Sequence, residues 1–357
     1  MPLLSAMIRG LLPLVLILPF FSFGEKAQIN EAVDQIILNE MKRQNIPGFA
    51  AAVIVKGNVI HAKGYGYSDL QAKIKVTPQT LFGIGSVSKT MTAFLVMLLN
   101  QNRQIDIDDS IREYLPSAPI DFDEVTIREL LSHTSGIPQY QGPHLPWPNT
   151  WEKISKKPFQ FEPGTSVKYN NFGYIVLTRL IENVTRKTYP EFLKEKVLNP
   201  LNMHATRIPE DLFPQGIATR YHIVEGQISL AKNLKPWKQM SGSGGIVSNL
   251  EDLIKWDKAM TAKKILSTES YKEMWSPQAL KNGQSSGWGL GWHLFQDKGK
   301  LIAKKDGGIA GFRSLIVRHI DDEISLIFLA NANPVRFSPF VNPIMELFQK
   351  EKPAPKS

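Results

Sequence analysis

A serine and a lysine three residues apart, Ser86 and Lys89, follow a glycine-punctuated segment at Gly83–Gly85. The apolar run Ala93–Leu99 comes next and predicts a buried helix that begins near the serine. Residues three apart lie on one face of a helix, so the Lys89 amine can reach the Ser86 hydroxyl and activate it as a nucleophile. The unpaired backbone N–H groups at such a helix start also point toward the place where an oxyanion would form.

The same Ser-x-x-Lys pattern occurs a second time, at Ser229–Lys232. This copy lacks the preceding glycines and the long apolar helix after it, so it is interpreted as a surface segment. The first copy is therefore the candidate nucleophile.

Two other segments place polar side chains in settings that suit chemistry. Tyr169 and Asn171 are two residues apart on an extended or turn segment after Pro163–Gly164, so their side chains face the same side. The segment Lys305–Gly308 lies at the end of a predicted strand, where glycines let a ligand approach the backbone closely. These segments add a phenol, an amide and an amine to the serine and lysine.

With these residues the sequence resembles the serine β-lactamase and penicillin-recognising enzyme family, in its branch of class C-like β-lactamases, D-alanyl-D-alanine carboxypeptidases and esterases. The family motifs Ser-x-x-Lys, Tyr-x-Asn and Lys/His-x-Gly correspond to Ser86–Lys89, Tyr169–Asn171 and Lys305–Gly307, in the family's order. The likeness covers nearly the whole mature chain. Further segments that resemble the family framework are Leu130–Ile137, Pro163–Gly164, Ser243–Gly245 and Gly287–Gly291.

The resemblance implies a catalytic set. Ser86 would attack a carbonyl carbon and be acylated, Lys89 and Tyr169 would share the general-base work, and water would release the acyl group through Tyr169. Ammonium groups at Lys89 and Lys305 are expected to favour the phenolate and so to lower the proton affinity of Tyr169. The backbone N–H groups of Ser86 and Gly308 would form the oxyanion hole, whose loss typically costs about 10²- to 10³-fold in rate.

The resemblance also implies substrate-binding residues in two of the motifs. Asn171 would position the substrate amide or the lysine amine, and Lys305 and Gly307 would contact the substrate. Asp306 departs from the family pattern, because relatives that bind a substrate carboxylate often carry Thr or Ser there. An aspartate at this position is expected to repel that anion.

A further pair near the C-terminus resembles a substrate-binding feature of the class C enzymes. Asn333 and Arg336 match the Asn and Arg that those enzymes place near the substrate carboxylate. An arginine here could equally be a surface residue.

Hydrophobic periodicity predicts the elements that must position these residues. Together with the resemblance it indicates an α/β fold of the α+β type, β-lactamase/transpeptidase-like, with an antiparallel sheet of about five strands flanked by helices. A mostly helical subdomain at approximately 86–240 would be inserted in the sheet subdomain, with the active site in the cleft between and residues 138–163 as a loop over it. The predicted elements are a helix at 27–44, a hairpin at 49–55 and 58–67, helices at 171–184 and 190–197, strands at 301–305, 312–319 and 323–331, and a helix at 343–350.

The N-terminal segment differs from the rest of the chain, which has 357 residues, 43% of them hydrophobic. Residues 1–24 combine one arginine, an apolar stretch and small residues at their end, which predicts a cleaved secretory signal peptide. A membrane anchor is disfavoured because the apolar stretch is short and is interrupted by Pro13 and Pro19. Residues 25–350 are predicted to form the hydrolase domain and 351–357 a disordered tail.

Composition excludes several kinds of site and partner. The sequence has no cysteine, which excludes disulfides and thiol catalysis and, with the predicted signal, suits a bacterial periplasm or exterior. The net charge is +9, but the lysines are scattered without a basic stripe, so no nucleic-acid partner is expected. No His-Glu-x-x-His motif and no phosphate-binding motif occurs, so neither a metal nor a cofactor is expected. His133 is interpreted as a residue that stabilises a loop.

The sequence therefore predicts a secreted serine hydrolase that works through an acyl-enzyme on Ser86. Its substrate would be a small molecule or a peptide: a D-Ala-D-Ala-type peptide, a β-lactam or a carboxylic ester. The alternative is a penicillin- or peptide-binding sensor that is acylated but hardly turns over. No stable membrane anchor is expected after signal cleavage, and no oligomeric state is predicted.

Overall fold

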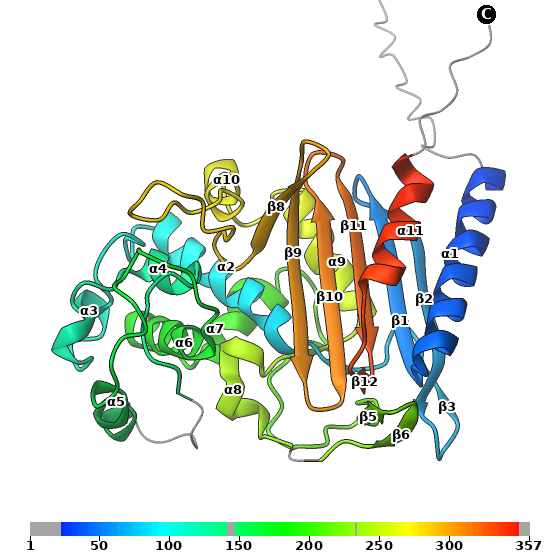
Figure 1. The fold of residues 1–357 in the computed structure, drawn as a ribbon, viewed down its shortest axis with the longest axis horizontal. Helices are drawn as coiled ribbons and strands as arrows, with labels where there is room; N and C mark the ends of the chain where they lie inside the picture. The colour runs from blue at the N-terminus through cyan, green and yellow to red at the C-terminus, as the bar shows by residue number, and fades with distance from the viewer. Residues whose placement is uncertain (1–22, 141–146, 233, 350–357) are drawn as a thin grey trace, which may run out of the picture.

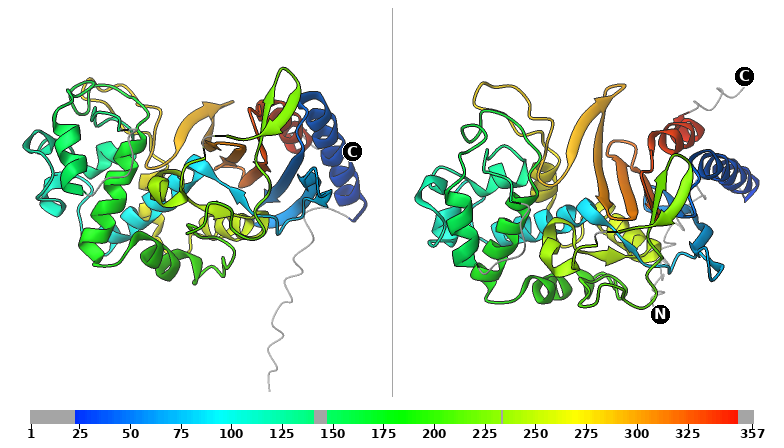
Figure 2. Two further views of the ribbon diagram at one scale, coloured as in Figure 1. Left: turned by 90° about the horizontal axis from the view of Figure 1, so that it is seen from below. Right: turned by 60° about the horizontal axis from the view of Figure 1, so that its bottom comes forward.

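The computed structural model describes residues 23–140, 147–232 and 234–349. They form three layers (Figure 1): a mostly helical region, a central sheet, and the helices α1 (Phe23–Gln44) and α11 (Ser338–Gln349) on the other face of the sheet. Figure 2 shows the same layers from two further sides. The predicted signal peptide lies outside the described residues except at its last two positions, and the predicted tail lies outside them entirely.

None of the helices in the described ranges is both long enough and apolar enough to cross a bilayer. The N-terminal apolar stretch lies outside these ranges, so the signal peptide stays a prediction.

The central sheet has seven strands in the order β3-β2-β1-β11-β10-β9-β8, and neighbouring strands are antiparallel. The predicted number of about five was low because two short edge strands carry little sequence signal. β3 has two residues, and β8 is exposed at four of its five positions. The strands are β1 (Gly48–Val55), β2 (Asn58–Asp69), β3 (Ile74–Lys75), β8 (His293–Asp297), β9 (Lys300–Ile309), β10 (Phe312–His319) and β11 (Ile324–Ala330).

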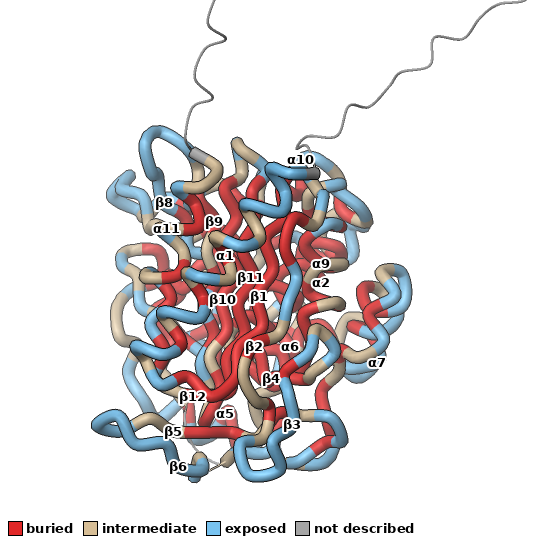
Figure 3. Tube along the Cα trace, turned by 90° about the vertical axis from the view of Figure 1, so that its right-hand side faces the viewer, coloured by how far each residue is buried: buried red, intermediate tan, exposed pale blue. Residues whose placement is uncertain are grey.

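The centre of the sheet is covered on both faces. β1 is buried at all eight positions, and Figure 3 shows that β11 and β10, the next two strands across the sheet, are largely buried as well. Ala50 and Ile54 pack toward the helical region, whereas Phe49 and Val53 pack toward α1 and α11. A strand that is covered on both faces has a continuous apolar sequence, which is what made β1 easy to predict.

The helical region lies between β3 and β8 in the sequence, so strands from both ends of the chain share one sheet. At its centre is α2 (Ser88–Gln101), which is buried from Ser88 through Leu99. The other helices of this region are α3 (Ile111–Tyr114), α4 (Ile127–Leu131), α5 (Trp147–Ser155), α6 (Asn171–Thr185), α7 (Tyr189–Leu193), α8 (Trp237–Gly244), α9 (Leu250–Thr261) and α10 (Thr268–Met274).

The segment 138–163 contains the helix α5, so its prediction as a continuous loop is wrong at those residues. The proline at position 148 is compatible with this helix because it lies in the first turn. Backbone N–H groups there have no hydrogen-bond partner within the helix, so the missing N–H of proline costs no bond. Residues 141–146 lie outside the described part of the chain.

The second Ser-x-x-Lys copy is not on a helix. Ser229 lies in strand β6 (Gln227–Leu230), which pairs with β5 (Tyr221–Val224) and has all four residues exposed. Without helical spacing Lys232 is not held on the face of Ser229, and the interpretation of this copy as a surface segment is confirmed.

Candidate active site

Ser86 lies in a short 3-10 turn, η1 (Gly85–Val87), that leads directly into α2. Gly85 has φ +50°, and a Cβ atom there would lie 2.8 Å from the backbone nitrogen of Gly308 in β9. A residue without a side chain is needed for η1 to approach β9 so closely. Ser86 itself is half-buried, so a substrate can reach its hydroxyl.

Lys89 extends from the first turn of α2 into the same site and is fully buried. Its Nζ lies 3.3 Å from Ser86 Oγ and 2.8 Å from Asn171 Oδ1, and it also donates to the carbonyl of Ser243. Burial, and then the charge of Lys305, lower the pKa of the Lys89 amine well below its usual value. A neutral amine at this distance can accept the Ser86 proton.

The N-terminus of α6 positions the Tyr-x-Asn motif. Asn170 caps the helix: its Oδ1 accepts from the Gly173 N–H at 3.1 Å, and its Nδ2 donates to the Ile137 carbonyl at 2.7 Å. Asn171 is the first helical residue and reaches Lys89, while Tyr169 precedes the cap. The motif therefore reaches the site because a helix begins there.

Tyr169 lies close to both lysines: Lys89 Nζ and Lys305 Nζ are 5.0 and 4.8 Å from the centre of its ring. Burial raises the pKa of the phenol above its usual value, although the neighbouring Ser86 hydroxyl acts in the opposite direction. The expectation of a lowered pKa is therefore wrong. The reason is that burial disfavours the charged phenolate, and it lowers the pKa of both amines as well.

Lys305 enters the site from β9 and is 2% exposed. Its Nζ lies 4.7 Å from the ring centre of Trp288, in addition to the contact with Tyr169. Burial lowers the pKa of Lys305 to about 7, while the carboxylate of Asp306 acts in the opposite direction. This amine can therefore gain or lose a proton near neutral pH.

The end of β9 forms an open edge beside Ser86. β8 pairs with β9 as far as Lys304, and among the described strands no further one continues this pairing. Ile309 and Phe312 close a two-residue turn between β9 and β10. The alternation of hydrogen bonds in an antiparallel pair then directs the N–H of Gly308 away from β10, toward the open edge.

Gly307 brings this edge against the start of η1. A Cβ atom on Gly307 would lie 2.1 Å from the carbonyl oxygen of Ile84 and 3.0 Å from the backbone nitrogen of Ser86. The N–H groups of Ser86 and Gly308 thus lie on two segments in direct contact. An oxyanion hole formed by these two groups requires this arrangement.

Asp306 lies on the opposite face of the sheet from Lys305, because side chains alternate along a strand. It is opposite Leu315 in β10, and its carboxylate is 3.4 Å from Nη2 of Arg313. The sequence predicts that Asp306 repels a substrate carboxylate, but its side chain lies on the face of the sheet away from Lys305 and beside Arg313. Its negative charge is partly offset by Arg313 and acts on the site by raising the pKa values of Lys89 and Lys305.

Asn333 and Arg336 follow β11. Asn333 belongs to β12 (Ala332–Asn333) and is opposite His222 of β5. The backbone of Arg336 exchanges hydrogen bonds of 2.9 and 3.0 Å with the side chain of Gln44 in α1. Among the described residues no contact joins either residue to Ser86, so their substrate-binding role stays a prediction.

Sequence reasoning missed three features of this site. The carbonyl of Ser243 accepts from Lys89, Trp288 covers Lys305, and Arg313 pairs with Asp306. Two of these residues lie in segments that resemble the family framework, which was the available signal. Arg313 had no signal of its own, because its pairing depends on the register between β9 and β10.

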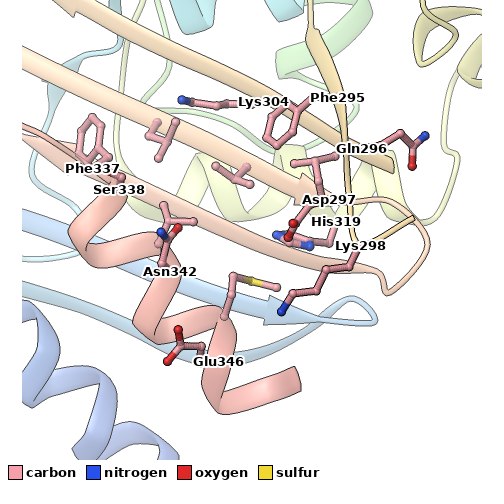
Figure 4. Close-up of a pocket in the computed structure, with 15 residues that line it drawn as sticks. Phe295, Gln296, Asp297, Lys298, Lys304, His319, Phe337, Ser338, Asn342 and Glu346 are labelled. Carbon is pink, nitrogen blue, oxygen red and sulfur yellow. The ribbon is translucent and has the colours of Figure 1, made fainter. Parts of the chain in front are cut away.

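A cavity of about 510 Å³ lies elsewhere, between α11 and the strands β8, β9 and β10 (Figure 4). Leu315, Val317 and Phe337 form part of its apolar lining, and the candidate site residues are not among those that line it. Within the described ranges, no group of three or more His, Asp or Glu side chains could hold a metal ion.

This chain is similar to known proteins both in sequence and in structure. The Beta-lactamase family model matches residues 33–346. The chain is 28% identical over 300 residues to penicillin-binding protein 4* of Bacillus subtilis (strain 168), covering 77% of this chain and 66% of that protein. It is 24% identical over 320 residues to protein flp of Staphylococcus aureus (strain NCTC 8325 / PS 47), covering 85% of this chain and 63% of that protein.

The chain thus spans 63% to 66% of the length of these curated relatives. Among solved structures it resembles the octameric penicillin-binding protein homologue from Pyrococcus abyssi, with a TM-score of 0.75, 24% identity, and coverage of 89% of this chain and 76% of that one. It also resembles D-amino acid amidase from Ochrobactrum anthropi SV3, with a TM-score of 0.78, 23% identity, and coverage of 90% and 99%. These structures support the β-lactamase/transpeptidase-like fold. Since the family model spans most of its length, the chain belongs to the Beta-lactamase family, within the serine β-lactamase and penicillin-binding protein superfamily.

Proposed function

We propose that the chain is a serine hydrolase that forms an acyl-enzyme on Ser86 and acts on an amide, a β-lactam or an ester. One observation carries this proposal: the buried amine of Lys89, with its lowered pKa, lies 3.3 Å from Ser86 Oγ. Membership of the Beta-lactamase family supports the same reaction type. A serine with a neutral amine beside it is an activated nucleophile.

In the acylation step Lys89 takes the Ser86 proton while Oγ attacks the substrate carbonyl carbon. The N–H groups of Ser86 and Gly308 would bind the carbonyl oxygen as it gains negative charge. The bond to the leaving group then breaks, and the leaving atom takes a proton from the Tyr169 phenol. The Lys89 ammonium returns a proton to the phenolate, so the site ends neutral with an ester on Ser86.

Deacylation uses the same groups in reverse. Water attacks the acyl carbon and gives a proton to Lys89 by way of the Tyr169 hydroxyl. Ser86 Oγ leaves and recovers a proton, which releases the carboxylic acid. The raised pKa of Tyr169 suits this role, because a protonated phenol can donate where a phenolate cannot.

Two relatives bear on the substrate. One is named a penicillin-binding protein and another a D-amino acid amidase. These names favour an amide or a β-lactam over an ester as the substrate of this chain.

The first test uses purified protein with a fluorescent penicillin, a chromogenic cephalosporin, D-phenylalanine amide and a p-nitrophenyl ester. Each is assayed with the wild type, Ser86→Ala and, as a matched control, Ser229→Ala in the second Ser-x-x-Lys copy. We expect turnover that Ser86→Ala abolishes and Ser229→Ala retains. Equal hydrolysis by Ser86→Ala would overturn the proposal, and a burst of one equivalent without a steady rate would favour the sensor.

We further propose export to a bacterial periplasm or the exterior. The apolar segment within residues 1–24 and the absence of cysteine from the sequence support it. N-terminal sequencing of protein recovered from cells should find a start near Glu25. A start at Met1 in all of the protein would contradict export by signal cleavage.

A further inference from the structure

His133 lies behind Tyr169, two residues after the end of α4. Its side chain is 1% exposed, and its backbone adopts φ +62°, a left-handed conformation that is uncommon for residues other than glycine. Such a conformation persists where the surrounding structure holds it in place. The side chain is directed accordingly into the wall of the Ser86 site.

His133 makes hydrogen bonds to both neighbours of Tyr169. Its backbone carbonyl accepts from the N–H of Lys168 at 3.0 Å, and its Nδ1 accepts from the N–H of Asn170 at 3.2 Å. His133 therefore binds the backbone on both sides of Tyr169. Asn170 is in turn the cap of α6, so the same contact joins the phenol to the rigid start of a helix.

The imidazole ring also packs against the aromatic side chains of the site. Its centre lies 4.4 Å from that of Tyr169 and 4.6 Å from that of Trp288, with the Trp288 ring nearly perpendicular at 87°. Lys305 Nζ contacts the rings of Tyr169 and Trp288 at 4.8 and 4.7 Å. His133 therefore fixes the ring of Tyr169 as well as its backbone.

The hydrogen bonds define the protonation state of His133. Because Nδ1 accepts from Asn170, the neutral ring carries its proton on Nε2, and that nitrogen is buried without a partner among the described residues. Burial, and then the charges of Lys305 and Lys89, lower the pKa of the imidazole well below its usual value. No hydrogen bond joins the ring to Ser86 in the described part of the chain, so the ring acts through its neighbours.

We propose that His133 is a positioning residue that holds the Tyr169 phenol in place for proton transfer, which rests on the function proposed above. A displacement of about 1 Å at a reacting group can cost roughly 10²-fold in rate. Loss of the imidazole should therefore lower kcat and leave KM nearly unchanged.

Two variants separate the contacts of His133. His133→Asn keeps an acceptor near the position of Nδ1 and tolerates the left-handed backbone, but it removes the ring. His133→Phe keeps a ring and removes the acceptor. With a p-nitrophenyl ester we expect each variant to lower kcat by roughly 10- to 100-fold. His133→Asn tests the proposal even where His133→Phe fails to fold.

A double-mutant cycle distinguishes positioning from a general structural role. In a Tyr169→Phe background the phenol is absent, and an activated ester with a good leaving group still reports acylation. If His133 acts through Tyr169, His133→Asn should change kcat by less than about twofold in that background. An equal loss in both backgrounds, or no loss in the wild-type background, would overturn the assignment. Residual activity in Ser86→Ala would instead count against the proposed function.

Discussion

Replacing Lys305 by glutamine should move the acid limb of the pH–rate profile to higher pH. The rate requires a neutral Lys89, and the charge of Lys305 lowers the pKa of that amine. Both Nζ atoms lie near one ring centre, at 5.0 and 4.8 Å, so they are at most about 9.8 Å apart. At an effective dielectric constant of about 20, two charges at that distance repel by about 1.7 kcal/mol. Removal of this repulsion should raise the pKa of Lys89 and move the acid limb in the same direction.

The direction in which the acid limb moves follows from the charge that Lys305 carries at acidic pH. Because the pKa of Lys305 is about 7, the amine is mostly protonated below that pH and opposes a second proton on Lys89. Without the charge of Lys305, Lys89 keeps its proton to a higher pH, so activity appears only at a higher pH. The variant should therefore lose most activity on the acid side and regain part of it as the pH rises.

The assay is kcat/KM for a neutral p-nitrophenyl ester between about pH 4 and 9. Lys304→Gln is the matched control, because Lys304 precedes Lys305 in β9 but lines the cavity on the other face of the sheet. Its limb should coincide with that of the wild type. A limb that is unchanged, or displaced to lower pH, in Lys305→Gln would refute Lys89 as the base.

Gly85→Ala should lower the free energy of unfolding by about 1–3 kcal/mol and remove most activity. The reason is that φ +50° strains an alanine and that its Cβ would lie 2.8 Å from the backbone nitrogen of Gly308. Urea unfolding measures the first effect and the ester assay the second. Arg318→Met should cost about 3–5 kcal/mol because it leaves buried Asp257 without its ion-pair partner, and adding Asp257→Leu should recover much of the loss. Stability should rise between about pH 7 and 10, by up to about 1.4 kcal/mol per pH unit, because unfolded Lys305 binds more protons there than the folded amine with its pKa of about 7. Urea unfolding at several pH values should show a shallower rise for Lys305→Gln.

Much of the catalytic set could be predicted because each motif joins residues that local structure keeps together. Ser86 and Lys89 lie one helical turn apart, and Tyr169 and Asn171 flank a helix cap. The convergence of motifs that are 82 residues apart, as in the bond between Lys89 and Asn171, is a tertiary property. The family resemblance supplied it, since no local pattern encodes it.

The features that sequence reasoning missed depend on burial and register. The pKa of Tyr169 is raised because the site is desolvated, and the sequence alone does not give the depth of a side chain. The ion pair of Asp306 with Arg313 requires the observed β9–β10 register, in which Arg313 is opposite Gly308. α5 was missed because prolines and polar residues surround its short apolar pattern.

The alternation along β9 explains which of two adjacent lysines faces Ser86. Lys304 and Lys305 have the same side chain, and a shift of one residue in register would exchange their faces. The shift that would bring Lys304 to the position of Lys305 would also bring Asp306 to the position of Gly307, where a Cβ would lie 2.1 Å from the carbonyl oxygen of Ile84. The glycine of the Lys-x-Gly motif therefore fixes the position of β9 against η1, and that position directs Lys305 into the site and Lys304 into the opposite cavity.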